Sequence, residues 1–150
     1  MLKYKYAALI PARGGSKGII NKNLRLINNV SLLGHSIVVC HAAKVFEQII
    51  VSTDSSEIAR EAQHFGVDVP RLRPETLATD ASSTESVISD VLQNEIRDDI
   101  HAVMLLQPTS PFRLPNHLIS ALRKFECSDL DSLLSVTPDH AFHWKIKGDQ

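Results

Sequence analysis

The chain has 150 residues, of which 43% are hydrophobic and 22% are charged, and its formal net charge is −1. Such a chain can bury one hydrophobic core, so we predict a single domain over residues 1–150. The near-neutral charge disfavours nucleic-acid binding, which needs a basic excess over a whole face. Neither a membrane-length apolar run nor a signal peptide is visible, so we expect a cytoplasmic protein with no membrane partner. The isolated Cys40 and Cys127 are predicted to be free thiols.

In the first half of the chain, apolar runs alternate with helical spacing. Residues 6–10 are typical of a buried strand, and residues 32–46 carry apolar side chains at helical spacing after a cap at Ser31. A second strand is predicted over residues 49–53. A helix then begins after Ser55 or Ser56 and ends at residues 64–65, where Gly66 suits the left-handed position that follows a helix. Residues 67–69 are expected to form a short extended piece.

The second half repeats the alternation. We predict a helix over residues 84–96, opened by Ser82 and Ser83, a strand over 102–106, a helix over 115–125 and a strand over 133–136. Apolar strands alternating with helices indicate an α/β fold with a mostly parallel sheet covered on both faces. In such sheets ligands bind beyond the carboxyl ends of the strands. The polar segments 13–23, 52–54 and 107–110 each follow a strand, so we expect them to share one rim.

The segment 10–18, Ile-Pro-Ala-Arg-Gly-Gly-Ser-Lys-Gly, followed by Lys22 and Asn23, is typical of a phosphate-binding loop. Adjacent glycines let backbone N–H groups converge on an anion, while Arg13, Lys17 and Lys22 supply charge-assisted hydrogen bonds. The alternative is a glycine-rich surface turn with solvated lysines.

The spacing of this loop excludes two common phosphate sites. Gly18 is followed by Ile19 rather than by lysine and serine or threonine, which excludes a GxxxxGK[ST] loop. Gly14 and Gly15 are adjacent, and the next helical pattern begins only near Ser31, which excludes a GxGxxG dinucleotide site. A long loop with three cations suits a nucleoside triphosphate better than a dinucleotide.

Five ordered motifs between residues 7 and 137 resemble the acylneuraminate cytidylyltransferases, the CMP-sialic acid synthetases. They are the loop 10–23, Ser-Leu-Leu-Gly-His at 31–35, Ile-Val-Ser-Thr-Asp at 50–54, Arg-Pro-Glu with Leu-Ala-Thr-Asp at 73–80, and Leu-Gln-Pro-Thr-Ser-Pro at 106–111. The resemblance implies a Rossmann-like nucleotidyltransferase fold, a three-layer sandwich. It also implies an enzyme in which the anomeric hydroxyl of a sialic acid attacks the α-phosphorus of CTP, giving the CMP-sugar and pyrophosphate, with Mg²⁺ required.

The resemblance assigns roles to residues at matching positions. It implies that Lys22 and Arg13 act in catalysis by neutralising the triphosphate. The sugar acid is expected at Gln107, Thr109 and Ser110. The nucleotide is expected at Ala12, Arg13, Gly14, Gly15, Ser16, Lys17, Asn23, Arg73, Ser82 and Ser83.

Several of these residues have structural alternatives. Lys17 can point at phosphate or at solvent, and Arg73 can be a surface arginine in a proline-flanked loop. Ser82 and Ser83 can cap a helix, a role that is compatible with ligand contact. Gln107 can satisfy loop backbone groups.

No metal ligand is assigned in this chain. Related enzymes that activate a keto-deoxy sugar of lipopolysaccharide carry a metal-binding aspartate where Thr109 stands, and the sialate family takes its metal at an aspartate pair further along the chain. Asp54, Asp80 and Asp139 are read as turn or cap residues. The resemblance also implies that the family fold continues past Gln150, with an arm that packs on a second subunit, so we expect an N-terminal portion of a homodimeric enzyme.

Two alternatives to the sialic acid enzyme stay open. One is a nucleotide-binding fragment that lacks part of the catalytic machinery. The other is a cytidylyltransferase for a different nonulosonic acid, legionaminic or pseudaminic acid, because the residues that distinguish these sugars lie mostly beyond this chain.

Overall fold

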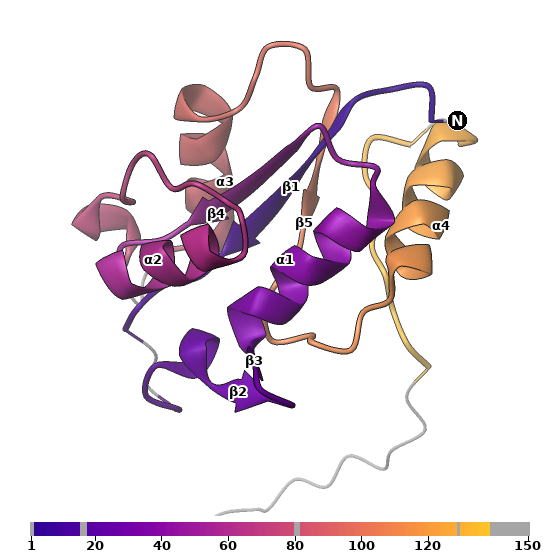
Figure 1. The fold of residues 1–150 in the computed structure, drawn as a ribbon. Helices are drawn as coiled ribbons and strands as arrows, with labels where there is room; N and C mark the ends of the chain where they lie inside the picture. Colours follow the sequence, from indigo (N-terminus) through magenta and orange to yellow (C-terminus); the bar gives the residue numbers. More distant parts are fainter. Residues whose placement is uncertain (1, 16–17, 80–81, 129, 139–150) are drawn as a thin grey trace, which may run out of the picture.

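The structure is a computed structural model that describes residues 2–15, 18–79, 82–128 and 130–138 (Figure 1). Strands and helices alternate along the chain, as the apolar runs predicted. In chain order the elements are β1 (Tyr6–Pro11), the 3-10 helix η1 (Lys22–Leu24), β2 (Leu26–Ile27), β3 (Val30–Ser31), α1 (Leu32–Ala43), β4 (Gln48–Ser52), α2 (Ser56–His64), the 3-10 helix η2 (Glu75–Leu77), α3 (Thr84–Asn94), β5 (Ala102–Leu105) and α4 (Pro115–Glu126).

The main sheet has the order β4-β1-β5, and both pairings are parallel. Ala8 of β1 lies opposite Ile49 on one side and Met104 on the other. The predicted α/β class and the parallel sheet are therefore confirmed. Since the three strands run in one direction, their carboxyl ends meet at one edge of the sheet.

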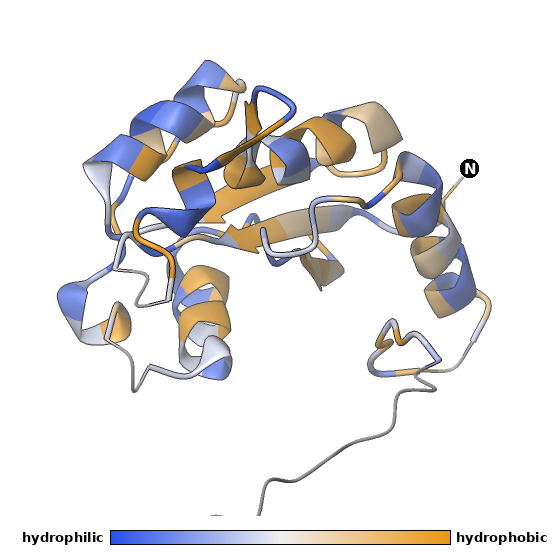
Figure 2. Cartoon of the chain, turned by 90° about the horizontal axis from the view of Figure 1, so that it is seen from below, coloured by the Kyte–Doolittle hydropathy of each residue, from blue (hydrophilic) through white to orange (hydrophobic). Residues whose placement is uncertain are grey.

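Helices cover both faces of this sheet, which gives three layers (Figures 1 and 2). Alternate residues of β1 point to opposite faces. Ala8 and Ile10 belong to the large core cluster, with apolar side chains of α1, α2 and α4. Leu9 packs on the other face against Val91 of α3. The strands consist mostly of hydrophobic residues, and the helices contain both hydrophobic and hydrophilic residues (Figure 2).

The helix starts follow the capping signals of the sequence. The Ser31 hydroxyl accepts a hydrogen bond from Gly34 N at 2.9 Å and opens α1. This helix ends at Ala43 rather than near residue 46, because Lys44 adopts a left-handed conformation with φ 53°. Gly66 follows the end of α2 with φ +81°, as predicted.

Two features differ from the sequence predictions. The predicted strand over residues 133–136 is wrong, since these residues form no strand and the side chains of Leu134 and Val136 are 82% and 84% exposed. A four-residue segment with three apolar residues is a weak signal, and a strand needs a partner edge. Conversely, the short hairpin of β2 and β3 was not predicted; its turn residues Asn28 and Asn29 both have positive φ.

Among the described residues, no helix combines the length and the apolar composition that a membrane crossing requires.

Candidate active site

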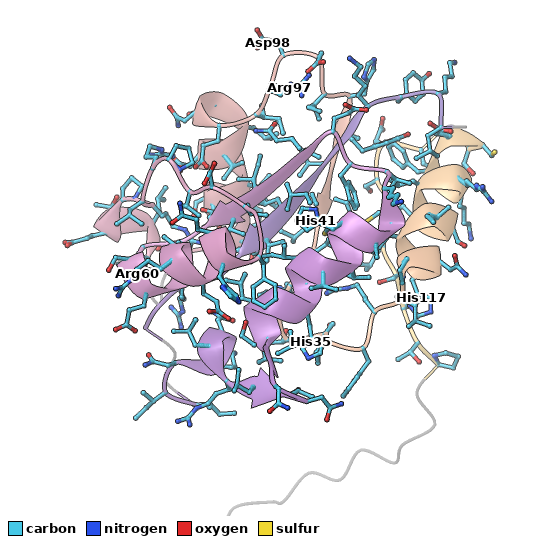
Figure 3. The ribbon with its side chains drawn as sticks, viewed as in Figure 1. His35, His41, Arg60, Arg97, Asp98 and His117 are labelled. Carbon is cyan, nitrogen blue, oxygen red and sulfur yellow. The ribbon has the colours of Figure 1, made fainter. Side chains whose placement is uncertain are left out.

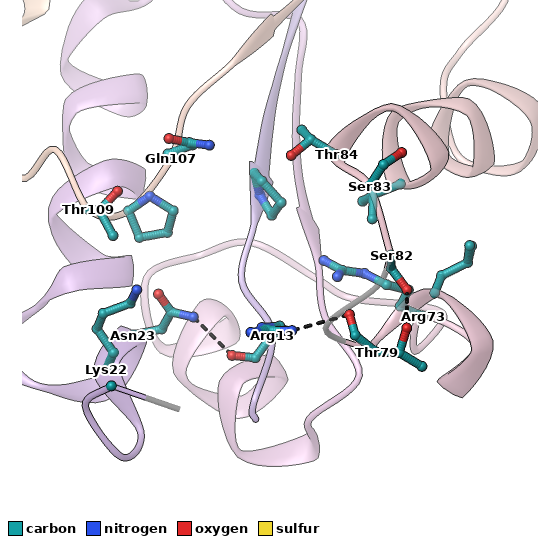
Figure 4. Close-up of a pocket in the computed structure, with 15 residues that line it drawn as sticks. Arg13, Lys22, Asn23, Arg73, Thr79, Ser82, Ser83, Thr84, Gln107 and Thr109 are labelled. Carbon is teal, nitrogen blue, oxygen red and sulfur yellow. Dashed lines mark hydrogen bonds between the residues drawn. The ribbon is translucent and has the colours of Figure 1, made fainter. Parts of the chain in front are cut away.

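A cavity of about 490 Å³ opens at the edge where β1 and β5 end (Figure 4). It brings together side chains from the loop after β1, the loop after β5 and the segment that leads into α3. The sequence predicted such a common rim for the polar segments 13–23 and 107–110. The residues that line it are Pro11, Arg13, Gly18, Lys22, Asn23, Arg73, Leu77, Thr79, Ser82, Ser83, Thr84, Val87, Gln107, Pro108 and Thr109.

The backbone of the loop after β1 is held against β4. Ala12 N donates to Ser52 O at 2.9 Å and thereby extends the ladder by one residue beyond β1. Gly14 N donates to Asp54 Oδ1 at 2.9 Å. Between these two amides, Arg13 O accepts from Asn23 Nδ2 at 3.0 Å. The buried Asn23 therefore joins the end of the loop to its beginning.

Two cationic side chains of this loop reach the cavity. Arg13 Nη1 donates to Thr79 O at 3.2 Å, which joins the loop to the segment before α3 (Figure 4). Lys22 begins the 3-10 helix η1, after Asn21 in a left-handed conformation with φ 52°. In Figure 4, Lys22 and Thr109 lie on one side of the cavity, and Arg73 and Ser82 lie on the other.

Arg73 is a buried arginine, which excludes the surface alternative. Its Nε donates to Ser52 Oγ at 3.1 Å, its Nη2 donates to Ser52 O, and its own N donates to Thr53 O at 2.6 Å. Desolvation lowers the pKa of Arg73, and the nearby Asp54 carboxylate opposes that shift. The guanidinium therefore both lines the cavity and fastens its own loop to the end of β4.

Ser82 and Ser83 line the cavity through different structural roles. Ser82 Oγ lies 2.8 Å from Thr79 Oγ1 and donates to Thr76 O at 3.1 Å, which closes a compact turn. Ser83 caps α3 by accepting from Ser86 N at 3.1 Å. For Ser83, helix capping and a place at the cavity coexist, as the sequence allowed.

The loop after β5 contributes Gln107 and Thr109 to the cavity. Its backbone is fixed by Arg113, whose Nη2 donates to Gln107 O at 2.7 Å, and by Ser110 N, which donates to the same oxygen at 3.2 Å. Desolvation lowers the pKa of Arg113. Sequence reasoning did not single out Arg113, because its contact depends on how the turn over 107–113 folds back.

The remaining predicted residues fall into two groups. Ala12, Gly14, Gly15 and Ser110 are described but are not among the residues that line the cavity; Ala12 is fully buried, and Gly14 acts through its backbone. Ser16 and Lys17 lie outside the described residues, as do Asp80 and Asp139.

The cavity is not built to hold a metal ion with side chains alone. No carboxylate is among the described residues that line it, and nowhere in the described ranges do three or more His, Cys, Asp or Glu side chains gather as metal ligands. Mg²⁺ is usually bound by one or two carboxylates together with substrate phosphates. The described residues of the cavity do not by themselves fit Mg²⁺ by this criterion.

A parallel sheet under helices, with a cationic cavity at the carboxyl ends of its strands, defines the class of nucleotide-binding α/β proteins. Within that class the chain belongs to the cytidylyltransferase family, whose pattern it matches over residues 7–140. This agrees with the resemblance seen in the five sequence motifs.

Curated relatives of the chain are named as cytidylyltransferases or as synthases of CMP-linked sugar acids. The chain is 42% identical over 133 residues to CMP-N,N'-diacetyllegionaminic acid synthase of Legionella pneumophila, covering 87% of this chain and 57% of that protein. It is 41% identical over 137 residues to N-acylneuraminate cytidylyltransferase of Escherichia coli, covering 91% of this chain and 32% of that protein. The chain therefore spans about half and about a third of these relatives' lengths.

Solved structures share the fold at low identity. CMP:2-keto-3-deoxy-manno-octonic acid synthetase, complexed with CTP, superposes with a TM-score of 0.67 at 21% identity, covering 81% of this chain and 47% of that chain. A cytidylyltransferase from Leptospira borgpetersenii gives a TM-score of 0.64 at 19% identity, covering 84% of this chain and 50% of that chain. Both support the Rossmann-like nucleotidyltransferase fold.

Proposed function

We propose that the chain binds CTP in the cavity and serves in the transfer of CMP to a sialic acid or a related nonulosonic acid. The observation that carries the proposal is the meeting of Arg13, Lys22 and Arg73 around one cavity whose described lining contains no carboxylate. Such a site favours a highly anionic ligand, and a triphosphate supplies that charge.

The reaction needs positioning and charge neutralisation more than covalent chemistry. The anomeric hydroxyl oxygen of the sugar forms a bond to the α-phosphorus and gives up its proton to solvent, the bond from that phosphorus to the bridging oxygen breaks, and pyrophosphate leaves. Arg13 and Lys22 would stabilise the negative charge that the phosphates carry through this step. Asn23, Arg73, Ser82 and Ser83 would hold the nucleotide, and Gly14 and Gly15 would let the backbone approach it.

The sugar acid would lie beside Gln107, Thr109 and Ser110, at the end of β5. Two relatives support the class of sugar acid: one is named for an acylneuraminate and the other for diacetyllegionaminic acid, and their identities to this chain are nearly equal. Both acids therefore belong in the test, together with pseudaminic acid. We further propose that Mg²⁺ accompanies the triphosphate, and that the enzyme acts as a homodimer in the cytoplasm.

The test measures pyrophosphate release from CTP, Mg²⁺ and each nonulosonic acid, with calorimetric binding of CTP in parallel. It uses both this chain and the longest natural chain that contains it. We expect the longest chain to release pyrophosphate and to prefer CTP over ATP, GTP and UTP. Binding of CTP without turnover by either chain would favour the nucleotide-binding module. A failure of both chains to bind CTP would refute the proposal.

A further inference from the structure

Asp54 occupies an unusual place for an acidic residue beside a phosphate-binding loop. It is the second residue after β4, and its Oδ1 accepts the hydrogen bond of Gly14 N at 2.9 Å. A carboxylate here repels a polyphosphate, and it also takes up an amide that could otherwise face an anion. Asp54 is not among the described residues that line the cavity, so direct contact with a ligand does not explain its presence.

The residues on either side of Asp54 are joined to each other by a hydrogen bond. Ser55 N donates to Thr53 Oγ1 at 3.1 Å, and Ser55 is the cap residue of α2. The loop also lies tightly against this corner, since a Cβ built on Gly14 would come within 3.0 Å of Ser55 Cβ. The bond from Gly14 to Asp54 therefore joins the loop to a corner formed by β4 and α2.

These hydrogen bonds hold the backbone around Arg13, which lies between the amides of Ala12 and Gly14. Ala12 N is held by Ser52 O on one side, Gly14 N is held by Asp54 Oδ1 on the other, and Arg13 O accepts from Asn23 Nδ2. With its backbone held at these points, Arg13 presents its guanidinium to the cavity from a fixed position. Positioning of this kind reduces the ordering cost of ligand binding.

We propose that Asp54 is a positioning residue: by accepting the Gly14 amide it holds Arg13 in the orientation that binds the triphosphate. The inference rests on the proposed CTP site. The proposed role involves no contact between Asp54 and the substrate. It also differs from a purely electrostatic role, in which the Asp54 carboxylate would act by raising the pKa of Arg73 against the effect of burial. The acceptor oxygen is the essential feature, and the charge is not.

The experiment compares Asp54→Ala, which removes the acceptor, with Asp54→Asn, which keeps an acceptor oxygen and removes the charge. We expect Asp54→Ala to raise the Kd for CTP about tenfold, the size of one lost hydrogen bond to a charged group. Asp54→Asn should stay within about threefold of the wild type, since its amide oxygen still accepts a hydrogen bond. The matched control is Asp98→Ala, an exposed aspartate in the loop before β5, at the opposite end of the strands.

Two further readouts separate positioning from a general loss of structure. In an Arg13→Ala background, adding Asp54→Ala should leave the Kd for CTP unchanged, because Asp54 affects CTP binding only through the position of Arg13. Without any nucleotide, hydrogen exchange at the Gly14 amide should be slow in the wild type and in Asp54→Asn, and fast in Asp54→Ala.

The outcomes are distinguishable. The inference is overturned if Asp54→Ala binds CTP as tightly as the wild type, or if Asp54→Asn binds CTP as weakly as Asp54→Ala. It is also overturned if Asp54→Ala still raises the Kd for CTP tenfold in the Arg13→Ala background. A wild-type chain that binds no CTP refutes the proposed function instead, and the hydrogen exchange at Gly14 then still shows whether the carboxylate holds the loop.

Discussion

Replacing Lys22 with alanine separates a ligand-binding side chain from a structural one. Lys22 is half-buried at the cavity, and its ammonium makes no hydrogen bond or ion pair with any other described residue. The bonds of its backbone, from Lys22 N to Ile19 O and from Arg25 N to Lys22 O, do not depend on the side chain. The substitution should therefore change the free energy of unfolding by no more than about 0.5 kcal/mol.

The effect on activity should be much larger. A hydrogen bond to a charged group is worth about 1.5–3 kcal/mol, and about 1.4 kcal/mol corresponds to a factor of ten. We therefore expect kcat/KM for CTP to fall about 10- to 100-fold in Lys22→Ala, with partial recovery in Lys22→Arg, which keeps the charge.

The assay is steady-state pyrophosphate release by the longest natural chain, with urea unfolding of the same preparations. Lys124→Ala is the control, since Lys124 is an exposed lysine of α4 without a described side-chain partner. The reasoning is refuted if Lys22→Ala loses activity only in proportion to its stability, or if its kcat/KM matches that of Lys124→Ala.

Three further substitutions and probes test the structure around the site. Arg73→Ala should lower the free energy of unfolding by about 2–3 kcal/mol in urea, because it removes charged hydrogen bonds at a buried position; unchanged stability would mean that these bonds do not form. Gly34→Ala should destabilise by about 1 kcal/mol in thermal unfolding, since overpacking against the Phe65 ring, 2.5 Å from the new Cβ, outweighs the gain in helix propensity; a raised Tm would contradict this. Burial raises the pKa of Cys40 to about 12, so at pH 8 a disulfide reagent should modify the exposed Cys127 and leave Cys40 unreacted until the chain unfolds; rapid reaction of both thiols would be the contrary result.

The fold was largely predictable because its signals are local. Ser31 and Gly66 mark helix ends through side-chain capping and a positive φ, which depend on a few neighbouring residues. The apolar runs of the three parallel strands are an equally local signal. The hairpin of β2 and β3 was not, since two asparagines in sequence suit many turns. The strand expected over 133–136 was wrong, because three apolar residues in a four-residue segment do not specify a pairing partner.

The site was predictable in its residue types but not in its connections. Sequence motifs placed Arg13, Lys22 and Gln107 near one rim, since loops after parallel strands converge. The hydrogen bonds of Asp54 and Arg113 were not predicted, because each depends on which backbone group another loop presents to the side chain. Arg73 was predicted at the nucleotide, yet its bonds to Ser52 could not be predicted, as they depend on the path of the whole segment after α2.

The carbonyl of Ser52 accepts from residues 12 and 73, which lie far from it and from one another along the chain. These bonds form only when β1 has paired with β4 and the segment after α2 has returned to the sheet. The two bonds close two long loops at one oxygen, and each loop closure costs chain entropy. Under the proposed function, recovery of nucleotide binding during refolding would therefore report completion of this edge of the sheet.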